Sequence, residues 1–138
     1  MKRIVVQILL SILALDCGFA EVEDSRDIVH TPDHQHYSRS AYEAGRRDAE
    51  RDLREGKLIF EMYGGPPPPW NGDWVKMLRE KYHIELKEVA GCVVDYRIVG
   101  HALGYNELSG AEIDRRFGTD FIRTSRAEVQ KQFEERHK

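Results

Sequence analysis

The sequence predicts a small α/β domain in which a short parallel sheet is covered by helices. Two short stretches alternate apolar and polar side chains, as half-buried strands do, and a stretch with helical spacing separates them. Helical patterns also precede the first strand and follow the second. The predicted order is therefore α-β-α-β-α-α. Strands that are joined through a helix pair in parallel with a right-handed crossover.

The first predicted helix covers residues 40–55. Ser40 and Glu43 form a capping box, in which a hydroxyl and a carboxylate bond to backbone amides that the first turn leaves free. Small and apolar residues then recur at helical spacing, and glutamate–arginine pairs four residues apart favour the same structure. Gly56 ends the helix.

The two strands are predicted within residues 57–65 and 84–91. Both have the period of two that places alternate side chains on opposite faces of a sheet. Gly64 and Gly65 end the first strand, and a run of four prolines then forms a polyproline II connector. Residues 120–123 are a candidate third strand.

Three further helices have recognisable starts. Asn71 or Asp73 caps the helix between the strands, because short polar side chains accept hydrogen bonds from the free amides of a first turn. Asp95 caps a third helix that runs to about Phe117, and Ser125 opens a terminal helix.

Gly100 and Gly104 lie four residues apart and therefore share one face of the third helix. Each glycine weakens a helix by roughly 1 kcal/mol relative to alanine. A glycine pair on one face allows a second backbone to approach closely there.

Residues 1–20 are predicted to be a secretory signal peptide. Lys2 and Arg3 begin the segment, a short apolar run follows, and small residues precede a cleavage site after Ala20. A retained anchor would need about 20 apolar residues, and this run is shorter. Lipid attachment at Cys17 is a weaker alternative, because an acidic residue precedes it. The mature chain is expected to be periplasmic or extracellular, without a stable membrane span.

The remaining chain has the length of one domain. Residues 21–38 have no apolar period and predict a mobile N-terminal arm, and residues 39–138 are predicted to form a single α/β domain. The formal net charge of −3 is small, and charges of both signs are mixed along the chain. Because such a chain has no electrostatic attraction for phosphate backbones, no nucleic-acid partner is expected.

Cys92 is the one cysteine outside the predicted signal peptide. It lies between the second strand and the third helix, where a helix dipole favours a reactive thiolate. A thiol nucleophile also needs a base, and neither His83 nor His101 has a position from which it reaches the thiol. The apolar neighbours Val93 and Val94 favour a buried, inert thiol over a nucleophile or an intermolecular disulfide.

A ligand site is predicted at the edge where both parallel strands end, because ligands of open α/β sheets usually bind there. Tyr63, Gly64 and Gly65 follow the first strand at this edge, and Gly91 and Cys92 follow the second. The glycines leave backbone amides uncovered for a ligand.

His30, His34 and His36 have spacings that can bind Zn²⁺, Cu²⁺ or Ni²⁺. Ordering this segment around a metal would cost conformational entropy, so a solvated arm is the favoured interpretation and metal binding is the alternative. No cofactor is expected, because the sequence has no glycine-rich phosphate-binding motif.

Five segments between residues 42 and 118 read, in order, "YEAGRRDAERDLREGKL", "YGGPPPPW", "LREKYHIEL", "VAGCVVD" and "GYNE". Together they resemble a group of small exported bacterial proteins without an assigned function. The resemblance implies a bacterial, exported protein and implies no activity.

These observations predict a bacterial envelope protein that acts as a non-catalytic binding or interaction module. Its partner is expected to be another envelope protein or a second copy of the same chain. A thiol-dependent enzyme using Cys92 is one alternative, and metal binding by the histidine arm is the other.

Overall fold

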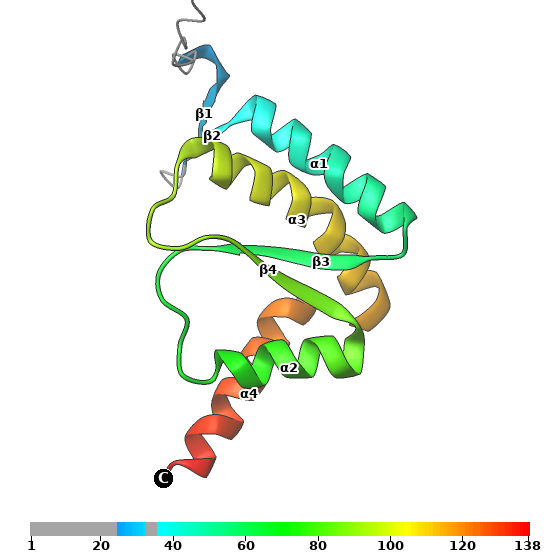
Figure 1. Cartoon of the computed structure of the whole chain (residues 1–138), viewed down its shortest axis with the longest axis vertical. Helices are drawn as coiled ribbons and strands as arrows, with labels where there is room; N and C mark the ends of the chain where they lie inside the picture. Colours follow the sequence, from blue (N-terminus) through cyan, green and yellow to red (C-terminus); the bar gives the residue numbers. More distant parts are fainter. Residues whose placement is uncertain (1–24, 33–35) are drawn as a thin grey trace, which may run out of the picture.

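The computed structural model describes residues 25–32 and 36–138 (Figure 1). The predicted signal peptide and His34 lie outside these residues. In chain order, the elements are the 3-10 helix η1 (Ser25–Asp27), β1 (Ile28–His30), β2 (His36–Ser38), α1 (Arg39–Arg54), β3 (Leu58–Tyr63), α2 (Asn71–Tyr82), β4 (Ile84–Ala90), α3 (Tyr96–Phe117) and α4 (Phe121–Arg136). The fold is of the predicted α/β class, and from α1 onwards its order is α-β-α-β-α-α.

An antiparallel hairpin precedes α1, where the sequence predicts a mobile arm. β1 and β2 pair with Val29 opposite Tyr37, and β2 packs against α3. The Asp27 carboxylate links the hairpin to the start of α1, because it accepts hydrogen bonds from the hydroxyls of Ser38 and Ser40 and from the Ser40 amide. These bonds lower the pKa of Asp27. The hairpin is stabilised by contacts with distant parts of the chain. Residues 21–38 have no apolar period of their own, so their sequence does not reveal these contacts.

The N-cap of α1 is Ser38 rather than the predicted Ser40. The Ser38 hydroxyl accepts a hydrogen bond from the Ala41 amide at 3.2 Å, whereas the Ser40 hydroxyl donates to Asp27. Serine is a favoured N-cap residue at either position, and Asp27, which is distant in sequence, decides between them.

Helices α1 and α3 lie side by side with their backbones in contact (Figure 1). A Cβ atom at Gly104 would lie 2.0 Å from the carbonyl oxygen of Tyr42, and one at Gly100 would lie 2.4 Å from that of Ser38. Gly45 of α1 meets the α3 backbone in the same way. The prediction that the glycine pair admits a second backbone is therefore confirmed.

Strands β3 and β4 form the predicted parallel pair, with Leu58 opposite Ile84. The register shifts after Met62, so that Tyr63 lies opposite Ala90. The pair alternates its side chains between two faces, one toward α2 and α4 and the other carrying Glu61.

The edge of β3 that faces away from β4 is bonded to side chains of α3. The Asn106 amide accepts a hydrogen bond from the Glu61 backbone N–H at 2.8 Å and donates one to the Glu61 carbonyl at 2.7 Å. The Ser109 hydroxyl donates to the carbonyl of Ile59. Polar side chains of a helix thus take the place of a neighbouring strand, which covers an otherwise open edge.

The apolar core lies between the sheet and the helices α2 and α4. Even-numbered side chains of both strands face this core, as the predicted period of two requires. Its buried members are Leu58, Trp70, Trp74, Leu78, Ile84, Ile113 and Val129.

Three predictions near the helix starts are wrong. Residues 120–123 belong mainly to α4 and form no third strand. Ser125 therefore lies inside α4, where its hydroxyl accepts a 3.1 Å hydrogen bond from Trp74 Nε1. Helix α2 begins at Asn71 without a side-chain cap. Ser125 and Asn71 each fit a capping pattern locally. In the fold, Ser125 makes a tertiary contact, and Asn71 is the first residue of its helix.

Candidate binding groove

A groove of about 310 Å³ lies where β3 ends and the chain turns toward α2. Tyr63, Gly64 and Gly65, which the sequence suggests as ligand-binding residues, line this groove. Gly91 and Cys92, the other two suggested residues, do not line it. The structure therefore brings only the β3 half of the predicted edge to this groove.

The turn that follows β3 builds one wall of the groove. Gly64 has a φ of +123°, which residues with a side chain rarely adopt, so the glycine allows the chain to leave the strand sharply. Residues 66–68 are prolines, whose fixed φ keeps this wall stiff. The apolar lining comes from β3, α2 and β4 and consists of Met62, Val75, Leu86 and Ala90.

Arg126 of α4 also lines the groove and packs over the two tryptophans. Its guanidinium carbon lies 5.3 Å from the ring centroid of Trp70 and 5.7 Å from that of Trp74. Both rings are buried, and the bond from Trp74 Nε1 to Ser125 fixes one of them. Within the described residues, Arg126 forms no ion pair with an acidic side chain. It is thus a cation positioned by the tryptophan rings, without an acidic partner among the described residues.

A second hollow, of about 740 Å³, adjoins the groove and shares Met62, Tyr63 and Arg126 with it. It lies between β3 and the helices α3 and α4. At its rim, Arg123 forms a 2.7 Å ion pair with Asp120. Because Arg123 already has an acidic partner, Arg126 is the cation that these two hollows offer to an anionic group.

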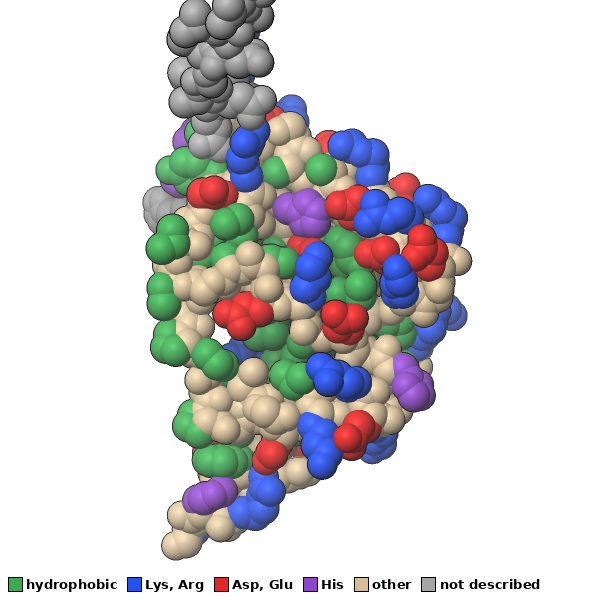
Figure 2. Space-filling view, viewed as in Figure 1, with side chains coloured by type: hydrophobic (Ala, Val, Ile, Leu, Met, Phe, Trp, Pro, Cys, Tyr) green, Lys and Arg blue, Asp and Glu red, His purple; other side chains and the backbone are tan. Residues whose placement is uncertain are grey.

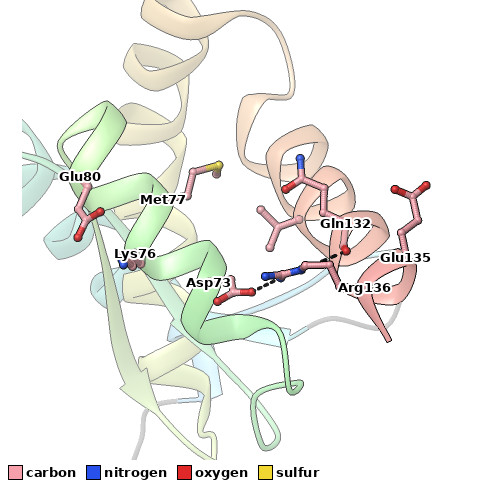
Figure 3. Close-up of a pocket in the computed structure, with 8 residues that line it drawn as sticks. Asp73, Lys76, Met77, Glu80, Gln132, Glu135 and Arg136 are labelled. Carbon is pink, nitrogen blue, oxygen red and sulfur yellow. Dashed lines mark hydrogen bonds and ion pairs between the residues drawn. The ribbon is translucent and has the colours of Figure 1, made fainter. Parts of the chain in front are cut away.

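A further groove, of about 610 Å³, lies between α2 and α4 (Figure 3). Asp73 and Arg136 form an ion pair that links the two helices across it. Most of its other lining residues are long charged or amide side chains, with Met77 and Val129 between them. Charges of both signs line this surface, so it favours neither an anionic nor a cationic ligand.

A polar network centred on the buried Glu61 carboxylate lies on the other face of the sheet. The Glu61 side chain is 0 % exposed, and its carboxylate accepts a 3.0 Å hydrogen bond from Lys87 Nζ and lies 2.8 Å from His101 Nδ1. The second ring nitrogen of His101, Nε2, lies 3.1 Å from the Asp48 carboxylate. The bond to His101 lowers the pKa of Asp48. Four side chains from α1, β3, β4 and α3 thus form one connected network.

Next to this network, the Tyr105 hydroxyl donates a 2.8 Å hydrogen bond to Asp52. Burial, together with this carboxylate, raises the pKa of Tyr105, so the phenol stays protonated at any physiological pH. The hydroxyl therefore joins α3 to α1 as a neutral donor.

The network contains residue types that serve in acid–base catalysis, but its groups are bonded to one another. Both ring nitrogens of His101 face carboxylates, so neither is free to accept a proton from a substrate. A network of this kind, bonded around a buried carboxylate, fixes how the surrounding elements fit together. The sequence does not reveal this network, because its partners are as many as 53 residues apart. The only local signal is Glu61, a carboxylate within an otherwise apolar strand.

Cys92 is exposed, which contradicts the buried thiol predicted from its apolar neighbours. Strand β4 ends at Ala90, and residues 91–95 form a loop in which Val93 is 86 % exposed. The apolar composition of this loop does not bury it, because no described element covers it. His101 is held by the buried network and is not available to the thiol as a base.

The structure brings together two of the three histidines considered for metal binding. His30 and His36 lie opposite each other across β1 and β2, with their Nδ1 atoms 2.9 Å apart. His34 lies outside the described residues. Within the described part of the chain, no group of three or more histidine, cysteine or acidic side chains is arranged to hold a metal ion.

Comparisons with known proteins find no matching family model, no similar curated protein and no similar solved structure. Among residues 25–32 and 36–138, no helix combines the length and the apolar composition that a membrane span requires.

Proposed function

We propose that this chain is a small exported protein of the bacterial envelope that acts by binding, with its ligand held in the groove at the end of β3. The observation that carries the proposal is the environment of Arg126. This cation lies over two buried tryptophan rings, borders two adjoining hollows and has no acidic partner within the described residues. A guanidinium held in this way supports recognition of a carboxylate.

The ligand we propose is a segment of another envelope protein that carries an acidic side chain beside an apolar one. The carboxylate would bond to Arg126, and the apolar side chain would contact Met62 and Leu86. The volume of about 310 Å³ is at the lower end of the range for small-ligand pockets, so it suits one or two side chains. Glu88 also lines the groove and would repel a segment with several negative charges.

Binding rather than catalysis is supported by the way in which the other polar groups are used. The histidine and carboxylates of the buried network are bonded to one another. The Cys92 thiol is exposed but does not line the groove. The groove itself is lined by one cation, one carboxylate, small polar groups and apolar side chains.

Intrinsic fluorescence provides a direct test of ligand binding at the groove. Trp70 and Trp74 are the only tryptophans of the chain, and both contact Arg126. Titration with a pool of short acetylated, amidated peptides that contain a central leucine–glutamate pair should change this fluorescence saturably. A matched pool with leucine–glutamine should have much less effect, because it lacks the carboxylate.

Two arginine variants provide the matched controls. Arg126→Met should weaken binding of the leucine–glutamate pool by more than about tenfold, since a charge-assisted hydrogen bond contributes about 1.5–3 kcal/mol. Arg123→Met should retain binding, because Arg123 is paired with Asp120. Equal binding of both pools, or wild-type affinity in Arg126→Met, would contradict the proposal. A fluorescence change on dilution without peptide would instead indicate that a second copy of the chain occupies the groove.

A further inference from the structure

The hairpin of β1 and β2 holds His30 and His36 against each other, away from the groove. The two residues are cross-strand partners, and their ring centroids lie 4.5 Å apart. His30 is exposed, and the half-buried His36 has the Tyr96 ring beside it at 6.2 Å between centroids. Within the described residues, neither imidazole bonds to a carboxylate. Each ring therefore has the other as its only hydrogen-bonding partner there.

The separation of the two Nδ1 atoms matches that of two ligands on one metal ion. Imidazole nitrogens bind first-row metals at about 2.0–2.1 Å. At that length, two ligands at a right angle lie roughly 2.9 Å apart, whereas two tetrahedral ligands lie roughly 3.3 Å apart. The observed 2.9 Å is the length of the hydrogen bond between the two rings, and it is also close to the separation in a right-angled, tetragonal site. Cu²⁺ and Ni²⁺ prefer this geometry, and Cu²⁺ binds nitrogen ligands more tightly.

We propose that His30 and His36 bind one Cu²⁺ ion through their Nδ1 atoms, with water in the remaining positions. One Nδ1 carries the proton of the hydrogen bond between the rings, and on metal binding this proton moves to Nε2 of the same ring. A small rotation of both rings then directs the two lone pairs at the ion. Because Asp27 links the hairpin to α1, the two ligands are positioned before the ion arrives.

The test uses the mature protein, produced without a histidine tag and with Cys92→Ser, because an exposed thiol also binds copper. One equivalent of Cu²⁺ should give an electron paramagnetic resonance spectrum with coupling to two imidazole nitrogens, and the melting temperature should rise. His30→Ala and His36→Ala should each remove this coupling and weaken Cu²⁺ binding by more than about tenfold. Metal-free melting temperatures of both variants should stay close to that of the parent, which would show that folding is intact.

The matched control is His34→Ala, which changes a histidine of the same segment that lies outside the described residues. It should keep both the two-nitrogen coupling and the copper affinity. Zn²⁺ serves as a second probe and should bind more weakly than Cu²⁺ at the same pair. Parent-like copper affinity in His30→Ala or His36→Ala would overturn the proposal. Loss of the two-nitrogen coupling in His34→Ala would do the same.

Discussion

The two faces of the β3–β4 sheet use charged groups in opposite ways. On one face, the buried Glu61 carboxylate, His101, Lys87 and Asp48 bond to one another. Figure 2 shows acidic and basic side chains interspersed over one side of the molecule. On the other face, an apolar core with two tryptophans supports Arg126, which has no acidic partner within the described residues.

This difference shows that residue types that occur in catalytic sites can also serve as internal bonding partners. The face with a histidine, carboxylates and a lysine has its polar groups engaged internally, so it serves the packing of α1, α3 and the sheet. The apolar face carries Arg126, a positioned cation without an acidic partner within the described residues. A ligand gains more from such a charge than from groups that must first give up their internal bonds.

The largest effect is expected from Gly104→Ala, which tests how closely α1 and α3 pack beside the polar network. The new Cβ would lie 2.0 Å from the backbone carbonyl oxygen of Tyr42, so α1 and α3 would have to separate. We expect a loss of about 3 kcal/mol or more in the free energy of unfolding, measured by chemical denaturation. Gly110→Ala is the control in the same helix, because its nearest atom is 3.9 Å away. It should be neutral or stabilising by up to about 1 kcal/mol, and similar losses in both variants would contradict the close packing.

The second effect concerns Glu61→Gln, which removes the central charge of the buried network. Lys87 and His101 would lose their shared carboxylate, so we expect a loss of about 2–3 kcal/mol in the free energy of unfolding. Lys87→Met should cost less than Glu61→Gln, because His101 still bonds to the Glu61 carboxylate and the lysine side chain is 51 % exposed. Peptide binding at the groove should be unchanged in Glu61→Gln. A loss of peptide affinity without a loss of stability would instead make the network part of the binding site.

A smaller effect is expected from Ser38→Ala, which removes the N-cap of α1. The Ala41 amide would lose its hydrogen-bond acceptor. We therefore expect the free energy of unfolding to fall by about 1 kcal/mol, measured by thermal or chemical denaturation at neutral pH. The same hydroxyl helps to lower the pKa of Asp27, and that contribution to stability is present above the unfolded pKa of about 3.9. It is lost as the pH falls through the lowered folded pKa. The difference between wild type and Ser38→Ala should therefore shrink in acid, and a difference that grows in acid would contradict this role.

The smallest effect is expected from Cys92→Ser. The thiol is exposed, so the free energy of unfolding should change by less than about 0.5 kcal/mol. In the wild-type protein, a neutral thiol reagent should modify Cys92 in the folded state at a rate similar to that in the unfolded chain. Strong protection of the thiol in the folded state would restore the burial that the sequence predicts.

The sequence predicts those parts of the fold that depend on local patterns. The α/β class, the parallel pair of strands and the extent of α3 follow from periodicity, and the contact at Gly100 and Gly104 follows from their spacing. The hairpin of β1 and β2 and the cap at Ser38 do not follow, because Asp27 and α3 stabilise them through distant contacts.

The candidate site is only partly predictable from the sequence for the same reason. Tyr63, Gly64 and Gly65 are suggested because a strand end is a local signal, and they line the groove. Arg126 is missed, because its role depends on two tryptophans that precede it by more than fifty residues. The exposure of Cys92 is missed, because apolar neighbours indicate burial only where another element covers the loop.

Nuclear magnetic resonance of the ¹⁵N-labelled protein with the leucine–glutamate peptide pool would locate the ligand on the molecule. If the groove at the end of β3 is the binding site, the largest shift changes should occur at the amides of Gly64 and Gly65 and at the indole signals of Trp70 and Trp74. These changes should vanish in Arg126→Met. Changes centred on the amides of Gly91 and Cys92, or on His101, would place the ligand elsewhere and contradict the proposed groove.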